Sequence, residues 1–151
     1  MRLIGELCGG RLRVTSTTGS GAEMDEALEE QARGARTQSI LRDVNERVKQ
    51  INETFGSILP LSEWICECYV DTCTDRMELT QDEYEAVRAK PMRFAVLPSE
   101  QHFNGRIEYL VEETDRYWVV EKFGVAGELA ARVDPRRVGL RGEASGRDST
   151  P

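Results

Sequence analysis

Three of the four cysteines of this 151-residue chain lie within eight residues, in the segment Cys66-Glu-Cys68-Tyr-Val-Asp-Thr-Cys73. Side chains two residues apart emerge on the same face of a strand, so Cys66 and Cys68 can direct both thiols at one point. Asp71 and Thr72 favour a turn, which would bring Cys73 back toward the first two thiols. We therefore expect a fold that holds three thiols close together.

Three neighbouring thiols indicate a zinc site that lacks one ligand, because zinc takes four tetrahedral ligands drawn mainly from thiolate and imidazole. The chain has a single histidine, His102, which we predict as the fourth ligand. The predicted metal ligands are thus Cys66, Cys68, Cys73 and His102, and the reserve candidates for the fourth position are Asp71, Asp75 and Glu67. A closed set of this kind leaves no position for water or substrate, so the expected role of the zinc ion is structural.

Two further interpretations of the cysteines remain open from the sequence. Free cysteines are often small buried apolar residues, and a pair such as Cys66 and Cys68 can form a regulatory disulfide. The segment before Cys8 has neither the apolar region nor the small residues of an export signal. We therefore expect a cytoplasmic protein, and in a reducing compartment clustered cysteines bind metal more often than they pair.

Residues 24–55 are predicted to form one long helix, since they contain no proline and a single glycine, Gly34. Apolar residues recur there at intervals of four, four, three and four, on one helical face: Ile40, Val44, Val48, Ile51 and Phe55. We expect this face to pack on the domain core. The competing possibility is a helix that forms a homodimer, because its acidic first half could project beyond a small core.

The chain after this helix alternates strand-like and turn-like segments. Strands are expected at residues 63–67, 76–79 and 94–97, and a hairpin joins 106–114 to 117–123 across Asp115-Arg116. Thr80 and Glu83 match a capping box, which predicts an inserted helix over residues 81–89 that ends before Pro91. A short helix is expected at 126–133, and Trp64 and Trp118 are predicted core residues.

These elements predict one α+β domain over residues 24–135, in which a long N-terminal helix precedes a small, mostly antiparallel sheet with one inserted helix and the zinc-binding loop at its edge. Residues 1–23 are rich in Gly, Ser and Thr and are expected to be a disordered leader, with Met24 as a second possible start. Residues 136–151 are polar and without period, so we expect a flexible tail.

Charge and motifs exclude several function classes. The chain has 20 basic and 27 acidic residues, a net charge of −7 that opposes binding to nucleic acid. No apolar run approaches the length of a membrane span. The sequence contains no phosphate-binding loop, dinucleotide fingerprint, HExxH or serine-hydrolase motif, so no catalytic residue is predicted.

Several short motifs between residues 35 and 135 resemble a group of uncharacterised small Cys/His-containing proteins of actinobacteria. The motifs are Arg42-Asp-Val-Asn-Glu-Arg-Val48, Cys66-Glu-Cys68, Cys73-Thr-Asp-Arg76, Glu83-Tyr-Glu-Ala-Val-Arg88 and Val119-Val-Glu-Lys122. In that group Pro-Gly-His follows the third strand, and here Pro98-Ser-Glu-Gln-His102 stands in its place. The resemblance implies the same Cys/His site and no particular activity.

Two functions fit these observations. The first is a non-enzymatic, zinc-stabilised protein-interaction or regulatory module, whose partner is another protein or a second copy bound through the long helix. The second is a thiol-based redox sensor or oxidoreductase that uses Cys66 and Cys68. Metal release by mild peroxide would distinguish the second from the first.

Overall fold

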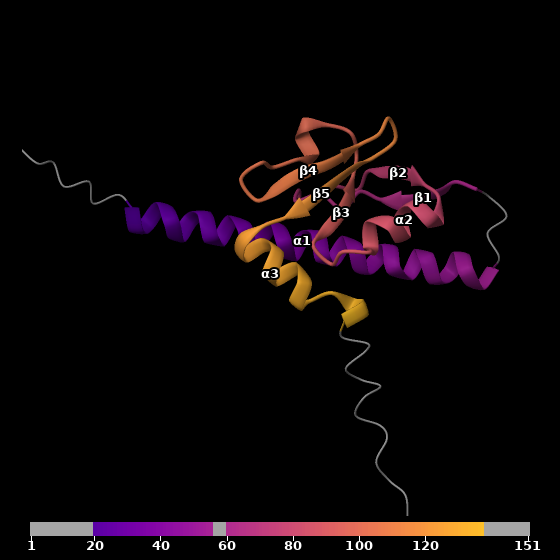
Figure 1. Cartoon of the computed structure of the whole chain (residues 1–151), viewed down its shortest axis with the longest axis horizontal. Helices are drawn as coiled ribbons and strands as arrows, with labels where there is room; N and C mark the ends of the chain where they lie inside the picture. The colour runs from indigo at the N-terminus through magenta and orange to yellow at the C-terminus, as the bar shows by residue number, and fades with distance from the viewer. Residues whose placement is uncertain (1–19, 56–59, 138–151) are drawn as a thin grey trace, which may run out of the picture.

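The chain has the predicted α+β architecture in a computed structural model, which describes residues 20–55 and 60–137. Helix α1 (Ser20–Phe55) runs beneath the sheets and extends past them at its N-terminal end (Figure 1). It is followed by β1 (Ser62–Ile65), β2 (Arg76–Leu79), α2 (Gln81–Arg88), β3 (Arg93–Val96), the 3-10 helix η1 (Glu100–His102), β4 (Glu108–Glu113), β5 (Trp118–Lys122) and α3 (Gly124–Arg132). The helix begins at Ser20, before the expected Met24, and the rest of the predicted leader lies outside the described residues.

The described strands form two antiparallel sheets where the sequence suggested one. Strand β1 pairs with β2, and the second sheet has the order β3-β5-β4. The predicted hairpin is confirmed: β4 and β5 are joined by a turn in which the Thr114 amide donates to the Tyr117 carbonyl at 3.0 Å. The cysteine segment connects β1 and β2 and is held against the second sheet, where the Glu67 amide donates to the Ala95 carbonyl at 2.9 Å.

Helix α2 begins at the predicted capping box. The Glu83 amide donates to the Thr80 hydroxyl at 3.1 Å, and the Thr80 amide donates to the Glu83 carboxylate at 2.8 Å. These two bonds satisfy amides that have no partner within the first helical turn. The inserted helix therefore starts where its local sequence dictates.

The three-stranded sheet separates two clusters of buried side chains because alternate residues of its strands point to opposite faces. Ala95 and Val119 pack with the predicted core residue Trp64 and with β2 and α2 on one face. Phe94, Val96 and Val120 lie on the other face, in a cluster that also contains the three cysteines and Ala130 of α3. The cysteine loop is therefore part of a hydrophobic core.

The apolar face predicted to bury α1 is not the face that the fold buries. Ile40, Val44 and Ile51 are exposed, Val48 is partly buried against the first cluster, and the side chain of Phe55 lies outside the described residues. The buried side carries Gln38, Arg42 and Asn45, which we call the polar row of α1. The prediction was wrong because the surface under the helix presents backbone groups and carboxylates, which need hydrogen-bond donors and acceptors more than apolar contact.

Gly34 allows α1 to approach the sheet closely. A Cβ at this position would lie 2.7 Å from Cδ1 of Ile107, so either the Ile107 side chain or α1 would have to shift. The same position lies against Tyr69 of the cysteine loop. Glycine at this site, unfavourable in a helix interior, is therefore explained by packing.

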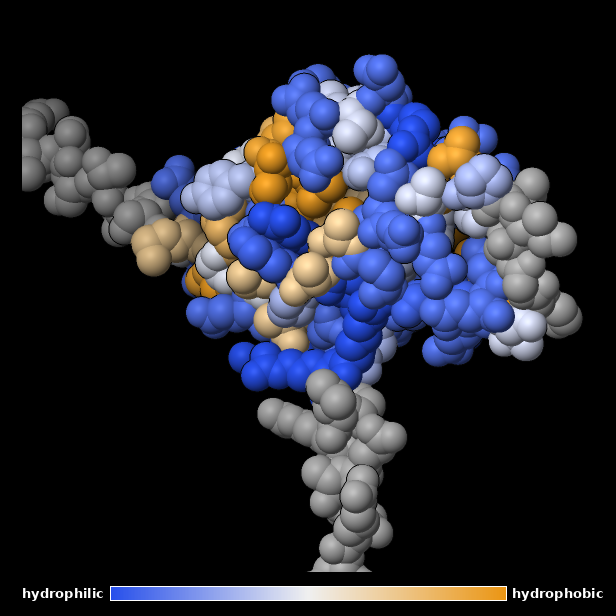
Figure 2. Space-filling model, turned by 45° about the vertical axis from the view of Figure 1, so that its right-hand side comes forward, coloured by the Kyte–Doolittle hydropathy of each residue, from blue (hydrophilic) through white to orange (hydrophobic). Residues whose placement is uncertain are grey.

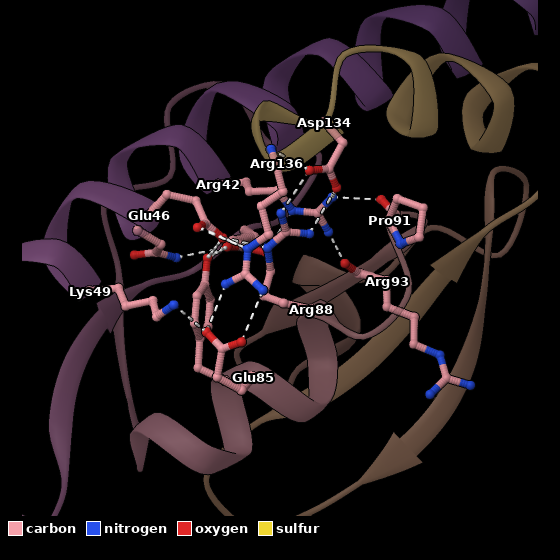
Figure 3. Close-up of polar contacts among 12 residues, drawn as sticks. Arg42, Glu46, Lys49, Glu85, Arg88, Pro91, Arg93, Asp134 and Arg136 are labelled. Atoms are coloured by element: carbon pink, nitrogen blue, oxygen red, sulfur yellow. Dashed lines mark hydrogen bonds and ion pairs between the residues drawn. The ribbon is translucent and has the colours of Figure 1, made fainter. Parts of the chain in front are cut away.

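A network of charged side chains joins α1, α2 and the segment after α3 (Figure 3). Arg88 donates to both oxygens of Asp134 at 3.0 Å and to Glu46 at 2.5 Å. Arg136, predicted as the first residue of a flexible tail, is instead held to the domain through Glu46 and Glu85. The described part of the domain thus extends through Arg137, and the remainder of the predicted tail lies outside it.

Hydrophilic residues cover most of the face seen in Figure 2, where apolar residues gather in a smaller patch. Among the described helices, none combines the length and apolar character that a membrane span requires.

Candidate metal centre

The four predicted ligands converge although they come from separate segments. Cys66 and Cys68 follow β1, Cys73 lies before β2, and His102 ends η1. Nδ1 of His102 lies 3.6 Å from Sγ of Cys66, 3.4 Å from Sγ of Cys68 and 3.7 Å from Sγ of Cys73. All four ligand atoms lie within 4.8 Å of one another, so they could hold a metal ion.

These distances fit a single tetrahedral ion. Bonds of about 2.3 Å to sulfur and about 2.0 Å to nitrogen give a sulfur–nitrogen edge of about 3.5 Å at the tetrahedral angle. The three observed distances of 3.4, 3.6 and 3.7 Å lie close to that value. A two-iron cluster would divide its four ligands between two metal atoms and hold them farther apart. The geometry therefore favours one ion over a cluster.

Asp75, a reserve candidate for the fourth ligand, has a different position. Its carboxylate oxygen Oδ2 lies 3.5 Å from Nε2 of His102, on the ring nitrogen that does not face the thiols. Metal-binding histidines commonly contact a carboxylate through that second nitrogen, which fixes the ring orientation. Neither Asp71 nor Glu67 belongs to the cluster. Asp71 is exposed, and the Glu67 carboxylate is hydrogen-bonded to Asn45.

Asn45 of α1 holds the strand that leads into the first cysteine. Its Nδ2 donates to the Ile65 carbonyl at 2.9 Å, and its Oδ1 accepts from the Ile65 amide at 2.9 Å. The side-chain amide thus makes the pair of hydrogen bonds that a neighbouring strand would make. Cys66 follows directly and donates its amide to the Asp75 carbonyl at 2.9 Å.

Glu67 orients the two cysteines on either side of it. Its side chain is fully buried and accepts hydrogen bonds from Asn45 Nδ2 at 2.9 Å and from the Tyr84 hydroxyl at 3.3 Å. Burial raises the pKa of this carboxyl, and the Arg42 guanidinium beside it opposes the rise. Glu67 thus faces α1, whereas the sulfur atoms of its two neighbours, Cys66 and Cys68, lie beside His102.

A second buried group holds the histidine loop. Glu108 accepts from the Asn104 amide at 3.1 Å and from Gln38 Nε2 at 3.1 Å, and Lys122 lies 2.9 Å away. Burial lowers the pKa of Lys122, and Glu108 opposes that shift. Asn104 is two residues from His102, so the polar row of α1 contacts both halves of the site: Asn45 holds the cysteine strand, and Gln38 acts through Glu108 on the histidine loop.

The thiols are not equivalent without a metal. Hydrogen bonds from Cys66 and His102 lower the pKa of Cys68 to about 5, while burial raises the pKa of Cys73 to about 11. The hydrogen bond to Cys68, together with burial, raises the pKa of Cys66. Near neutral pH the metal-free site therefore holds one thiolate, and a metal ion must displace protons from the other two.

The residues that support the site from α1 were not predicted from the sequence. Gln38, Arg42 and Asn45 recur at intervals of four and three, the same spacing as an apolar face, and that polar periodicity was the available signal.

Comparisons of the chain with protein-family models, with curated proteins and with solved structures found no match.

Proposed function

We propose that this chain is a non-enzymatic, zinc-stabilised module that binds another protein, with one structural zinc ion held by Cys66, Cys68, Cys73 and His102. The observation that carries the proposal is the convergence of three sulfur atoms and one imidazole nitrogen within 4.8 Å of one another, with sulfur–nitrogen distances close to those of a zinc tetrahedron. A ligand set of three thiolates and one imidazole binds zinc in preference to harder cations.

A structural role follows from where the ligands sit. The three cysteines are buried and pack with Phe94, Val96 and Val120, so the ion would join the cysteine loop and the histidine loop to the sheet. Four protein ligands leave no position at which the ion could activate water. The cytoplasm would keep the thiols reduced and available to the metal.

A thiol redox sensor, the second candidate function, is less favoured by the structure. Redox-active cysteines are generally accessible to an oxidant, whereas Cys66 and Cys68 are fully buried. The redox role stays a prediction, and peroxide treatment can test it. A sensor would release its metal and form a Cys66–Cys68 or Cys68–Cys73 disulfide detectable by mass spectrometry.

Elemental analysis of protein purified without chelator tests the main proposal. We expect about one zinc ion per chain and a lower melting temperature after the metal is removed. Cys66→Ser, Cys68→Ser and Cys73→Ser should each lose the metal, and His102→Ala should weaken its binding. Cys8→Ser is the matched control and should keep it. Less than about 0.2 zinc per chain, with thermal stability unchanged by chelator, would refute a structural zinc site.

A further inference from the structure

The side of α1 opposite the polar row carries three exposed apolar residues. Ile40 is 65% exposed, Val44 41% and Ile51 56%, and we call these three the outer row of α1. Their spacing of four and seven residues keeps them within a narrow line along the helix, because seven residues complete almost two turns. Isolated exposed apolar residues are common, whereas an aligned row on a long helix matches the seam of a helix pair.

The helix is long enough for such pairing. Its 36 residues correspond to a length of roughly 54 Å at about 1.5 Å per residue. Figure 1 shows the sheets on one side of α1 and its N-terminal part extending beyond them. Because the outer row is exposed, a second helix could lie along it without displacing the elements that contact the polar row.

We propose that the outer row of α1 pairs with the same row of a second copy of this chain, in an antiparallel homodimer. The proposal names the partner of the interaction module proposed above, and so rests on it. In a two-fold dimer the same surface of both copies meets, so each charged group must lie opposite a complementary group of that same surface. The charged residues beside the outer row meet this condition.

Arg47 selects the antiparallel orientation. It lies between Val44 and Ile51 on the outward side of the helix and is exposed. A parallel pair would set Arg47 of one copy against Arg47 of the other and place like charges together. An antiparallel pair with Ile40 opposite Ile51 of the second copy instead offsets the two Arg47 side chains by three residues, about 4.5 Å along the helix.

The same register brings opposite charges together. The two-fold axis of this register passes between the two helices at the level of residues 45 and 46. Asp43 and Arg47 lie on opposite sides of that level, at almost the same distance along the helix. Arg47 of each copy is then level with Asp43 of the other, to within about one helical rise of 1.5 Å. Each dimer would contain two such pairs beside an apolar seam.

Sedimentation equilibrium of the zinc-loaded chain, from about 5 to 500 µM, tests the proposal. We expect a monomer–dimer equilibrium within this range. Val44→Lys, which places a like charge in the seam level with Arg47 of the second copy, should raise the dissociation constant at least about tenfold. Val111→Lys is the matched control, because Val111 is 42% exposed on β4 and lies outside the outer row. It should leave the dissociation constant unchanged.

A charge exchange tests the orientation. Asp43→Arg and Arg47→Asp should each weaken the dimer, because each sets like charges opposite one another, and the double variant should restore it. Circular dichroism and zinc content of every variant establish that the monomer is folded.

Three results would overturn the proposal. A monomer at about 500 µM would show that the outer row does not pair with a second copy. A dimer that persists in Val44→Lys would place the interface elsewhere, and a double charge variant that fails to restore pairing would exclude the antiparallel register. None of these results bears on the zinc site, which fails only if the metal is absent.

Discussion

Replacing Asn45 with leucine tests whether the polar row of α1 supports the fold and the metal site. Asn45 is fully buried and makes three hydrogen bonds of 2.9 Å: two with the backbone of Ile65 and one with Glu67. Leucine is apolar and of similar length but has no polar atom. The Ile65 amide and carbonyl would therefore lose their partners on the side facing α1.

The expected cost is large for a single substitution. An orphaned buried backbone group costs about 1–3 kcal/mol, so the two groups of Ile65 cost about 2–6 kcal/mol together. Burial of the added apolar surface returns about 1–2 kcal/mol. These two contributions leave a net cost of about 0–5 kcal/mol, and the lost hydrogen bond to Glu67 adds about 1 kcal/mol. We therefore expect Asn45→Leu to lower the free energy of unfolding by about 1–6 kcal/mol, and to weaken zinc binding because the strand that leads into Cys66 is less well fixed.

Urea denaturation, followed by circular dichroism, measures the first effect, and competition with a chromogenic chelator measures the second. Gln50→Leu, at an exposed position of the same helix, is the control and should change the free energy of unfolding by less than about 0.5 kcal/mol. If Asn45→Leu were as stable as the control, the hydrogen bonds to Ile65 would not support the fold, and the account of the buried face of α1 would be wrong.

Three further outcomes are expected. Asp75→Asn should lower zinc affinity by about tenfold in chelator competition, since its carboxylate orients His102, and an unchanged affinity would remove that role. Zinc binding near pH 7 should release about two protons per ion into a weakly buffered indicator solution, because only Cys68 has a pKa well below 7. Zinc affinity should therefore rise with pH. Release of three protons would contradict the conclusion that Cys68 is already a thiolate in the metal-free site. Arg88→Met should lower the free energy of unfolding by about 3–5 kcal/mol in urea, because buried Asp134 loses a bidentate partner. The exposed pair of Arg76 and Glu63 provides the comparison: Arg76→Met should cost less than about 1 kcal/mol, and equal losses would contradict the role of burial.

The cluster of Cys66, Cys68, Cys73 and His102 was predictable because its signal is local in the sequence. Cys66, Cys68 and Cys73 share one short segment, and the chain has a single histidine, so the four candidates followed from composition and spacing. The pairing of His102 with Asp75 was not predictable, because it depends on how the β3–β4 connection lies against the cysteine loop. Asp75 could be identified from sequence only as a nearby carboxylate.

The sequence by itself determined the elements whose cause is local. The capping box of Thr80 and Glu83 started α2, the turn at Asp115-Arg116 joined β4 to β5, and helical composition made α1 one continuous helix. Each of these depends on interactions within a few residues, which the sequence displays directly.

The tertiary structure alone decided which side of α1 is buried. Both an apolar and a polar row recur along this helix at helical spacing, and apolar burial is the usual outcome. Here the surface beneath the helix contains the backbone edge of β1 at Ile65 and the buried carboxylates of Glu67 and Glu108. These groups cost more to leave unpaired than the outer row costs to leave in water, so the helix turned its polar row inward.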